Sequence, residues 1–594
     1  MVSQTSTSRS WTSHYDAGVP ATVAPYPNRT LVDYLDDTAR QYADRPALLF
    51  KGRTITYGEL GALSDAVATH LVRLGVKRGD RVALCLPNCP QFSIAQYGAW
   101  KVGAVVCPIN PTYTDREMED ALVATDAETL VVLNRFYERL KGVQPHTSLK
   151  RLITTGIKDF LPGHLRILYG LLKERKDGER ITPRGEDVRL GALMRAEPGA
   201  RRPDVRVAPT DVSSILMSGG TTGTPKGVVG NHGGLVMAGL QLRAWLSPAM
   251  NEWTDIIMLP LPLFHTYGFT GVQALAMVNH NPIALIPNPR DMPDLLQAIN
   301  TVKPAFICAV PTLLNGIMNH PLTRAGKIDF KSLKLCFCGA AALMAETTKR
   351  WQELTGGVIL EGYSLTEAQM AVVANPVQGP KKLGSVGMPL PDVEIRIADA
   401  DDPRTPVTQG AVGEIVIVAP QLMVGYWKRE RETQDMLHTG DGGERILLTG
   451  DLGYLDADGY LFIVDRKKDL IKTSGFQVWP REIEEVIASN PAVAEVGVAG
   501  LPDEMKGEIV KAWVILRPGM SATPEALRAY CRQTLAPFKV PAQIEIVTEL
   551  PMSQTGKVLR RVLRDGEAKK QAAVDVRETA ASTGLRDGSM PGLQ

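Results

Sequence analysis

The chain of 594 residues has no uninterrupted apolar run of about 18 residues, the length that a membrane-spanning helix requires. Its nearest candidate, residues 256–278, is broken by Pro260, Pro262, His265 and several glycines. The polar N-terminus also lacks the apolar core of a signal peptide. We therefore expect a cytoplasmic protein that does not span a membrane, while attachment to a membrane surface stays open.

The sequence also lacks a large excess of positive or negative charge, and it lacks cysteines at the spacing of a metal site. The 66 Lys and Arg residues are balanced by 64 Asp and Glu residues, so the net charge of +2 gives no argument for a nucleic-acid partner. The seven cysteines form no Cys-x-x-Cys pair with the spacing of a zinc site. Cys336 and Cys338 alternate with Phe337 as in a strand, and a reducing cytosol fits the odd count best.

What is present is an alternation of short apolar runs and helical patterns, which is typical of α/β layers around mostly parallel sheets. A chain of this length needs more than one core. From about residue 385 the pattern becomes alternating β, which suggests a small barrel or sheet, and a new unit begins near Asp469. The expected organisation is a disordered N-terminus (1–25), a large α/β domain (26–466, β-rich over 385–466), a small α+β domain (467–566) and a disordered tail (567–594).

Residues 157–200 interrupt this alternation with a polar stretch around 164–173. Its mixture of apolar and basic residues fits a short amphipathic helix. We predict that this helix packs on its own domain. A helix that rests on a membrane surface is the alternative.

Residues 218–227 read SGGTTGTPKG and follow the apolar run 212–217, so they form a loop that leaves a buried strand. Glycines let backbone N–H groups approach an anion, threonines add hydroxyl donors, and Lys226 adds charge, which together suit a phosphate-binding loop. It is not a Walker A loop, because Pro225 precedes the lysine and Gly227 follows it.

This loop resembles the signature of the acyl-adenylate-forming superfamily, which contains acyl-CoA synthetases, peptide-synthetase adenylation domains and luciferases. Only Gly219 departs from that pattern, where serine is usual. Further motifs follow in the family's order, and the resemblance covers roughly residues 30 to 565. It implies a large N-terminal domain of layered α/β subdomains with a small β-barrel-like part, followed by a small mobile C-terminal domain.

The second motif, EGYSLTE at 361–367, combines an aromatic face, a hydroxyl and a hard carboxylate. By resemblance, Tyr363 stacks on adenine, Thr366 contacts phosphate and Glu367 holds Mg²⁺, with Thr221 as a second ligand. Ser364 stands where glycine is common. The resemblance implies an ATP site made by Ser218, Gly219, Gly220, Thr221, Thr222, Gly223, Thr224, Pro225, Lys226, Gly339, Ala340, Ala341, Gly362, Tyr363, Ser364, Asp451 and Arg466.

Thr-Gly-Asp occurs twice, and only one copy can supply the aspartate that the family uses to bind ribose. In the family this aspartate precedes a β-hairpin and lies about 15 residues before an arginine. Asp451 meets both conditions, with a turn at 455–460 and Arg466 after it. Asp441 lies in a Gly-rich stretch and is interpreted as a loop residue.

The remaining motifs concern the hinge between the domains, coenzyme A, the catalytic lysine and the acyl pocket. By resemblance, Lys468 is an interdomain hinge, and Lys472, Ser474 and Gly475 serve the state that binds coenzyme A. Lys557 matches the lysine that reaches the acid carboxylate and the α-phosphate. The resemblance also implies that the segment 262–268 lines the acyl pocket, with His265 at its mouth.

These motifs together predict an Mg²⁺-dependent ligase that activates an apolar carboxylic acid with ATP, releases pyrophosphate and transfers the acyl group to coenzyme A. The likeness is greatest to bacterial long-chain fatty-acid–CoA ligases. Loading of a carrier-protein thiol, activation of a specialised acid, and a catalytically silent nucleotide-binding protein remain alternatives. His265 after Phe264, where amino-acid-activating relatives have aspartate, argues against an α-amino acid. Homodimer formation stays open.

Overall fold

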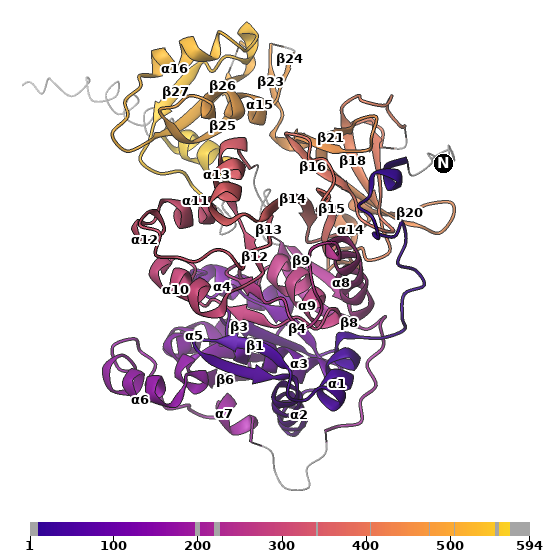
Figure 1. Cartoon of the computed structure of the whole chain (residues 1–594), viewed down its shortest axis with the longest axis vertical. Coiled ribbons are helices and arrows are strands. Elements are labelled where there is room, and N and C mark those ends of the chain that lie inside the picture. Colours follow the sequence, from indigo (N-terminus) through magenta and orange to yellow (C-terminus); the bar gives the residue numbers. More distant parts are fainter. Residues whose placement is uncertain are drawn as a thin grey trace, which may run out of the picture. The chain divides into compact units, whose positions relative to one another are not determined.

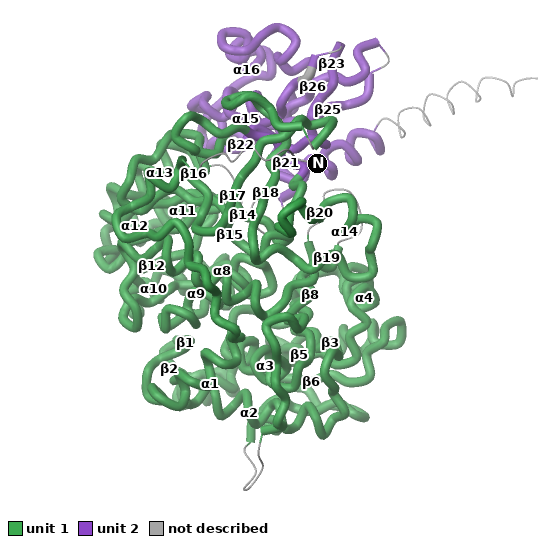
Figure 2. The backbone as a smooth tube through the Cα atoms, turned by 90° about the vertical axis from the view of Figure 1, so that its right-hand side faces the viewer, with its two compact units in different colours: residues 1–449, 454–462 green, residues 450–453, 463–594 purple. Residues whose placement is uncertain are grey.

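The computed structural model describes residues 10–195, 202–218, 226–339, 343–403, 405–474, 476–503, 505–552 and 558–570. The chain divides into two compact units (Figure 2), one made of residues 1–449 and 454–462 and the other of residues 450–453 and 463–594. The changeover falls within two consecutive strands, β21 (Arg445–Leu455) and β22 (Leu461–Arg466). The mixed α/β class predicted from the sequence is confirmed in both units.

The longest sheet contains a parallel centre and antiparallel arms. Strands β1, β11, β10, β12, β13 and β14 pair in parallel, whereas β15 and β16 continue antiparallel into the β-rich part at one end. Its order is β17 (Glu394–Ala398), β18 (Gly413–Val418), β21, β22, β16 (Ser385–Pro389), β15 (Met370–Ala374), β14 (Val358–Leu365), β13 (Leu335–Cys338), β12 (Phe306–Ala309), β10 (Ile257–Leu259), β11 (Ile283–Leu285), β1 (Pro46–Phe50) and β2 (Arg53–Thr56), with β20 (Leu437–Thr439) beside β21.

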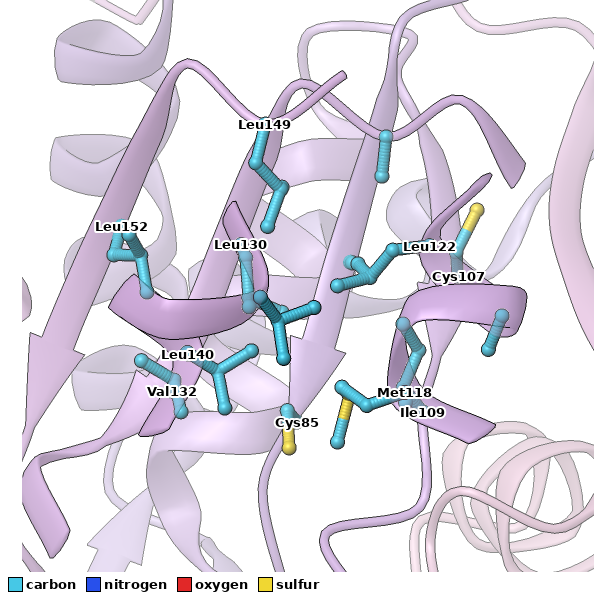
Figure 3. Packing of buried hydrophobic residues seen from close by; sticks show 14 of the residues in the cluster. Cys85, Cys107, Ile109, Met118, Leu122, Leu130, Val132, Leu140, Leu149 and Leu152 are labelled. Carbon is cyan, nitrogen blue, oxygen red and sulfur yellow. The ribbon is translucent and has the colours of Figure 1, made fainter. Parts of the chain in front are cut away.

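A second sheet of the large unit is parallel from β8 to β7 and ends in two antiparallel strands. Its apolar residues pack against two helices that cover one face, as Figure 3 shows for Leu130, Leu122 and Leu140. The order is β19 (Gly425–Tyr426), β9 (Lys226–Asn231), β8 (Val212–Ser218), β4 (Val105–Pro108), β3 (Arg81–Cys85), β5 (Thr129–Leu133), β6 (Arg151–Thr155) and β7 (Val188–Arg189).

Helices cover these sheets (Figure 1), and their boundaries follow local capping. At the first helix, the Thr30 hydroxyl accepts from the Asp33 N–H, and the Asp33 carboxylate accepts from the Thr30 N–H. The helices are α1 (Leu31–Gln41), α2 (Tyr57–Arg73), α3 (Pro90–Trp100), α4 (Asp115–Thr125), α5 (Tyr137–Val143), α6 (Gly163–Leu172), α7 (Leu190–Leu193), α8 (His232–Leu246), α9 (Gln273–Val278), α10 (Met292–Val302), α11 (Pro311–Asn319), α12 (Pro321–Arg324), α13 (Ala345–Thr355), α14 (Glu430–Met436), α15 (Pro480–Ala488) and α16 (Pro524–Cys531).

The small unit has its own sheet and core. Helices α15 and α16 pack on a cluster that includes Ile483, Ile487, Val498, Val514 and Leu527. Strand order is β24 (Phe476–Val478), β23 (Ile471–Thr473), β26 (Gly507–Leu516) and β25 (Val493–Asp503), with β27 (Gln543–Ile546) parallel to β26. This is the small α+β domain that the sequence predicts.

The predicted disorder is wrong for residues 10–25 and 567–570, which the structure describes as ordered. Residues 10–25 are packed on the large unit, because Trp11 is buried and Asp16 accepts hydrogen bonds from the backbone N–H groups of Gln378 and Gly379 at 2.9 and 2.6 Å. At the other end residues 560–570 are helical, and Glu567 pairs with the buried Lys511 at 2.9 Å. The polar composition of these segments concealed the few contacts that order them.

The predicted helix at residues 164–173 is present, but it packs on its own domain less closely than expected. This segment forms α6, but no residue of the helix is buried. Only Leu165 and Tyr169 are half-buried on the side toward the unit, so much of the apolar surface of α6 faces outward. Among the described residues no helix is both long and apolar enough to cross a membrane.

Candidate active site

The predicted phosphate loop connects two antiparallel strands. Ser218 ends β8 and Lys226 begins β9, and the two residues are paired in register. The Ser218 hydroxyl donates to the Lys226 carbonyl at 3.2 Å, which holds the two ends of the loop together. The predicted loop residues Gly219, Gly220, Thr221, Thr222, Gly223, Thr224 and Pro225 lie outside the described residues.

The second motif occupies a tight hairpin between β14 and β15. Tyr363 is buried on β14 and pairs in register with Val373, while Thr366 and Glu367 lie in the turn. The turn is closed by the Gln369 N–H, which donates to the Thr366 carbonyl at 3.0 Å. Gln369 has a φ of +52°, a conformation that non-glycine residues rarely adopt. The hairpin thus presents Thr366 and Glu367 together at its tip.

A residue that the sequence reasoning missed, Tyr426, joins the two motifs. Its hydroxyl donates to Glu367 Oε1 at 2.9 Å, and Lys226 Nζ lies 4.9 Å from the centre of its ring. Burial, and then the negative charge of Glu367, hold the pKa of Tyr426 well above its usual value, so the phenol stays a donor. Tyr426 reaches this place because β19 pairs with β9, with Tyr426 opposite Val228.

The backbone of the same region is held by Met423, whose N–H donates to the Glu367 carbonyl at 2.8 Å. Both the main chain and the side chain of Glu367 are therefore fixed by the segment 423–426. Within the sequence, the only signal was a Gly-Tyr-Trp run shortly after the strand 413–418. That signal does not reveal a partner about 200 residues earlier.

A glycine at position 362 lets two of the predicted motifs approach each other closely. A Cβ on Gly362 would lie 2.6 Å from the Phe337 ring, so only glycine fits there without displacement. A Cβ on Gly339 would lie 3.7 Å from the Tyr267 ring and 4.0 Å from the Gly362 carbonyl. Tyr267 in turn donates to the Phe337 carbonyl at 2.7 Å. Segments 262–268, 337–339 and 361–367 therefore meet, whereas Ala340 and Ala341 lie outside the described residues.

His265 lies in the tight turn that the acyl-pocket motif forms. Its Nδ1 accepts from the Tyr267 N–H at 3.3 Å, so the neutral ring carries its proton on Nε2. A Cβ on Gly268 would lie 2.5 Å from the Pro262 carbonyl, which shows how closely this turn is wound. The half-buried imidazole thus lies beside Tyr267, whose ring would be 3.7 Å from a Cβ built on Gly339.

In the small unit, Asp451 and Arg466, two residues that the resemblance places at the ATP site, form an ion pair. Arg466 Nε lies 3.0 Å from Asp451 Oδ1, and Asp451 is buried. Asp441, by contrast, is exposed in the turn 440–443, which the Gly443 N–H closes onto the Gly440 carbonyl. Burial and pairing favour Asp451 over Asp441 as a functional aspartate.

The predicted hinge residue lies in a short 3₁₀ turn, Lys467–Asp469. Desolvation by the surrounding protein, together with the charge of Arg466, lowers the pKa of Lys468 to about 8. Asp469 in the same turn is buried.

The residues predicted to serve coenzyme A follow this turn. Lys472 is exposed on β23, and its backbone N–H donates to Glu508 Oε2 at 2.7 Å. Ser474 has a φ of +50° and donates its N–H to the Lys506 carbonyl at 2.8 Å. Gly475 lies outside the described residues.

Lys557 also lies outside the described residues, but both sides of its segment are described. Met552 and Val558 form an antiparallel bridge. The residues on either side of the segment 553–557 are therefore neighbours. Just beyond, Arg560 pairs with Glu484 at 2.7 Å and with Asp465 at 2.6 Å. These carboxylates raise the pKa of Arg560 against the effect of burial, which ties the segment after Lys557 firmly to the small unit.

A magnesium ion needs hard oxygen ligands but few of them from the protein, because it keeps waters and binds nucleotide phosphates. The described residues contain no cluster of three or more His, Cys, Asp or Glu that could hold a metal alone. Glu367, a single oriented carboxylate at the hairpin tip, fits an ion that is shared with a phosphate chain. The donor set therefore suits Mg²⁺.

Comparisons with known proteins agree with this arrangement. Residues 35–427 match the family described as AMP-binding enzyme, and residues 482–557 match the AMP-binding enzyme C-terminal domain. A long-chain-fatty-acid–CoA ligase of Yersinia pestis is 36% identical over 94% of this chain and 98% of its own. One of Bacillus subtilis is 34% identical over 94% of this chain and 98% of its own. ATP-bound MatB from Rhodopseudomonas palustris superposes with a TM-score of 0.76 at 27% identity, covering 91% of this chain and 99% of that one.

Proposed function

The chain belongs to the AMP-binding enzymes, as an AMP-forming acid–thiol ligase, and we propose that the residues described above carry its two half-reactions on a long-chain, apolar carboxylic acid. The enzyme uses ATP and coenzyme A as substrates and Mg²⁺ as cofactor. The acid class is proposed from the names of the relatives and from the absence of a carboxylate beside Phe264 that could pair with a substrate amine.

The first half-reaction makes a carboxylate reactive. Its oxygen attacks the α-phosphorus of ATP, the bond to the bridging oxygen breaks, and pyrophosphate leaves. Charge on the phosphates is the main barrier, so positioning and charge neutralisation do most of the work. Lys226 would neutralise phosphate charge in the large unit, and Lys557 would neutralise charge that develops between the acid and the α-phosphate. Bound Mg²⁺ would supply further neutralisation at Glu367.

One observation carries this proposal: Tyr426 contacts both Lys226 and Glu367. The cation at the end of the phosphate loop and the proposed magnesium ligand are therefore one side chain apart. A cation and a carboxylate placed this close suit a site that holds a polyphosphate together with a divalent cation.

The nucleoside would be bound by residues from several motifs. Tyr363 and the closely packed backbone at Gly339 and Gly362 suit the face of a purine ring. Asp451, oriented by Arg466, has two carboxylate oxygens that could accept hydrogen bonds from the two ribose hydroxyls. These roles follow the family's motifs, position by position.

In the second half-reaction the thiol of coenzyme A attacks the acyl carbon, and AMP leaves. We assign Lys472, Ser474 and Gly475 to the coenzyme A-binding state, and Lys468 to the hinge at which the small domain changes its orientation between the two steps. His265 is assigned to the mouth of the acyl pocket. Buried, unpaired thiols such as Cys308 support the proposal that the enzyme works in the reducing cytoplasm.

The function is tested by measuring pyrophosphate release over a panel of carboxylic acids, with and without coenzyme A. We expect release that depends on Mg²⁺, ATP and an apolar acid, with thioester formed only when coenzyme A is present. Turnover of ATP to ADP would contradict the adenylation mechanism. Acyl-AMP that accumulates without transfer to coenzyme A would indicate a carrier-protein thiol as the acceptor.

A further inference from the structure

Helix α6 exposes an apolar stripe. Ile167, Leu168, Leu171 and Leu172 retain 67%, 51%, 79% and 67% of their surface, although each is a large apolar residue. Their spacing of i, i+1, i+4 and i+5 places them on one continuous side of the helix. The helix lies at the edge of the large unit (Figure 1), and none of its residues is buried.

The helix is nevertheless held in place. The Tyr169 hydroxyl donates to Asp177 at 3.0 Å, and Glu174 forms an ion pair with Lys158 in the preceding turn. The Glu179 N–H donates to the Glu174 carbonyl at 2.9 Å, and the Asn134 side chain donates to the Glu179 carbonyl at 3.0 Å. These contacts fix the base of the segment, so the exposed stripe is a property of a folded element.

Basic residues outnumber acidic ones around the stripe. In the segment 163–180, Glu174 is paired, Asp177 accepts from a tyrosine, and Glu179 is buried. The basic residues are exposed and have no ion-pair partner among the described residues. They are Arg166, Lys173, Arg175, Lys176 and Arg180. An anionic lipid surface suits this arrangement, because apolar side chains can enter the acyl region while unpaired cations bind the negatively charged headgroups.

We propose that α6 docks the enzyme on an anionic lipid bilayer, with Ile167, Leu168, Leu171 and Leu172 entering the boundary of headgroups and acyl chains. A second copy of the chain fits less well, because two such helices would bring like charges together. One face of a ten-residue helix is also small beside the roughly 1,200 Å² or more that a stable interface buries.

Docking would serve the proposed function, because a long-chain acid partitions into the bilayer from which the enzyme must take it. The biological purpose of docking rests on the proposed function, but the experiment that tests docking does not depend on it. Binding to vesicles needs neither ATP nor coenzyme A. A failure of the ligase reaction and a failure of docking are therefore observed separately.

The experiment is cosedimentation of the full-length protein with vesicles of phosphatidylcholine, alone or mixed with phosphatidylglycerol. We expect binding to the mixed vesicles that weakens with added salt. The double variant Ile167→Glu/Leu171→Glu should reduce the partition coefficient by about tenfold or more, since it places charge in the apolar contact. Lys173→Gln/Lys176→Gln should weaken binding to the anionic vesicles only.

The matched control is Val123→Glu/Leu383→Glu, which adds the same charge at two other exposed apolar side chains. It should bind as the wild type does. All these positions are exposed, and unchanged turnover of a water-soluble short-chain acid checks that each variant folds. The proposal is overturned if the wild type ignores anionic vesicles, if the α6 variant binds as well as the control, or if the α6 variant instead converts a dimer to a monomer in sedimentation velocity.

Discussion

The Tyr426 hydroxyl donates a hydrogen bond to Glu367 Oε1 at 2.9 Å, while the ring of the same tyrosine lies beneath the ammonium group of Lys226. One side chain therefore orients both an anionic and a cationic member of the proposed phosphate site. A hydrogen bond to a charged group contributes more than one between neutral groups. We therefore expect Tyr426 to set the orientation of the Glu367 carboxylate.

Tyr426→Phe separates the two contacts, because it keeps the ring and removes the hydroxyl. We expect kcat/KM for ATP to fall by roughly tenfold, in line with the loss of a hydrogen bond to a charged group. The Mg²⁺ concentration for half-maximal activity should rise in parallel, which a general loss of stability would not cause. Tyr460→Phe is the matched control, since it removes a hydroxyl that donates to the Pro380 carbonyl. An equal fall in both variants, with no change in Mg²⁺ dependence, would contradict the role of Tyr426.

The two Thr-Gly-Asp copies offer an internal comparison. Asp451→Asn should raise KM for ATP by roughly tenfold or more, because it weakens the acceptor pair for the ribose hydroxyls and the ion pair with Arg466. Asp441→Asn makes the same chemical change in an exposed turn and should leave KM unchanged. Steady-state kinetics with varied ATP would distinguish them. The opposite order of effects would show that Asp441 is the functional copy.

Lys557→Ala should affect one half-reaction. Its charge would act only on the transition state of adenylation, so acyl-AMP formation should fall by about 10²–10³-fold. Transfer from pre-made acyl-AMP to coenzyme A should proceed at the wild-type rate. The two steps are measured separately, as pyrophosphate release and as thioester formation from synthetic acyl-AMP. A similar loss in both would mean that Lys557 supports the fold of the segment between Met552 and Val558.

Local patterns predicted much of this molecule. The apolar run 212–217 identified β8, because a strand buried on both faces needs consecutive apolar residues. The spacing of Asp451 to a hairpin turn and to Arg466 favoured it over Asp441, and Asp451 is the copy that is buried beside Arg466. These features depend on residues that are close in sequence or on motifs that belong to one family.

Features that depend on distant pairing were not predicted. The partnership of Tyr426 with Glu367 and Lys226 exists because β19 joins the edge of a sheet whose next strand begins at Lys226. The exposure of α6 could not be read from its amphipathic pattern, because the same pattern fits a helix on a domain and a helix on a membrane. Both features depend on which distant part of the chain, if any, packs against the side chain, and a local sequence pattern does not contain this information.

A final prediction concerns Glu179, which anchors the segment that carries α6. Burial raises the pKa of this carboxyl from 4.5 to about 7, and its Oε2 has no hydrogen-bond partner among the described residues. The folded state therefore holds its proton more tightly than the unfolded state does. This contribution to stability is fully present below pH 4.5, declines as the pH rises toward 7, and is absent above that value.

Glu179→Gln removes the titration while keeping the size of the side chain. The variant should gain stability over the wild type across the range from pH 4.5 to 7, by up to about 3 kcal/mol, and the difference should then stay constant. Urea unfolding at a series of pH values measures this. Glu186→Gln, at an exposed carboxylate seven residues further along the chain, is the control and should show no such trend. A stability difference that does not change with pH would mean that Glu179 is already ionised in the folded protein, and that a neighbouring cation such as Arg135 outweighs its burial.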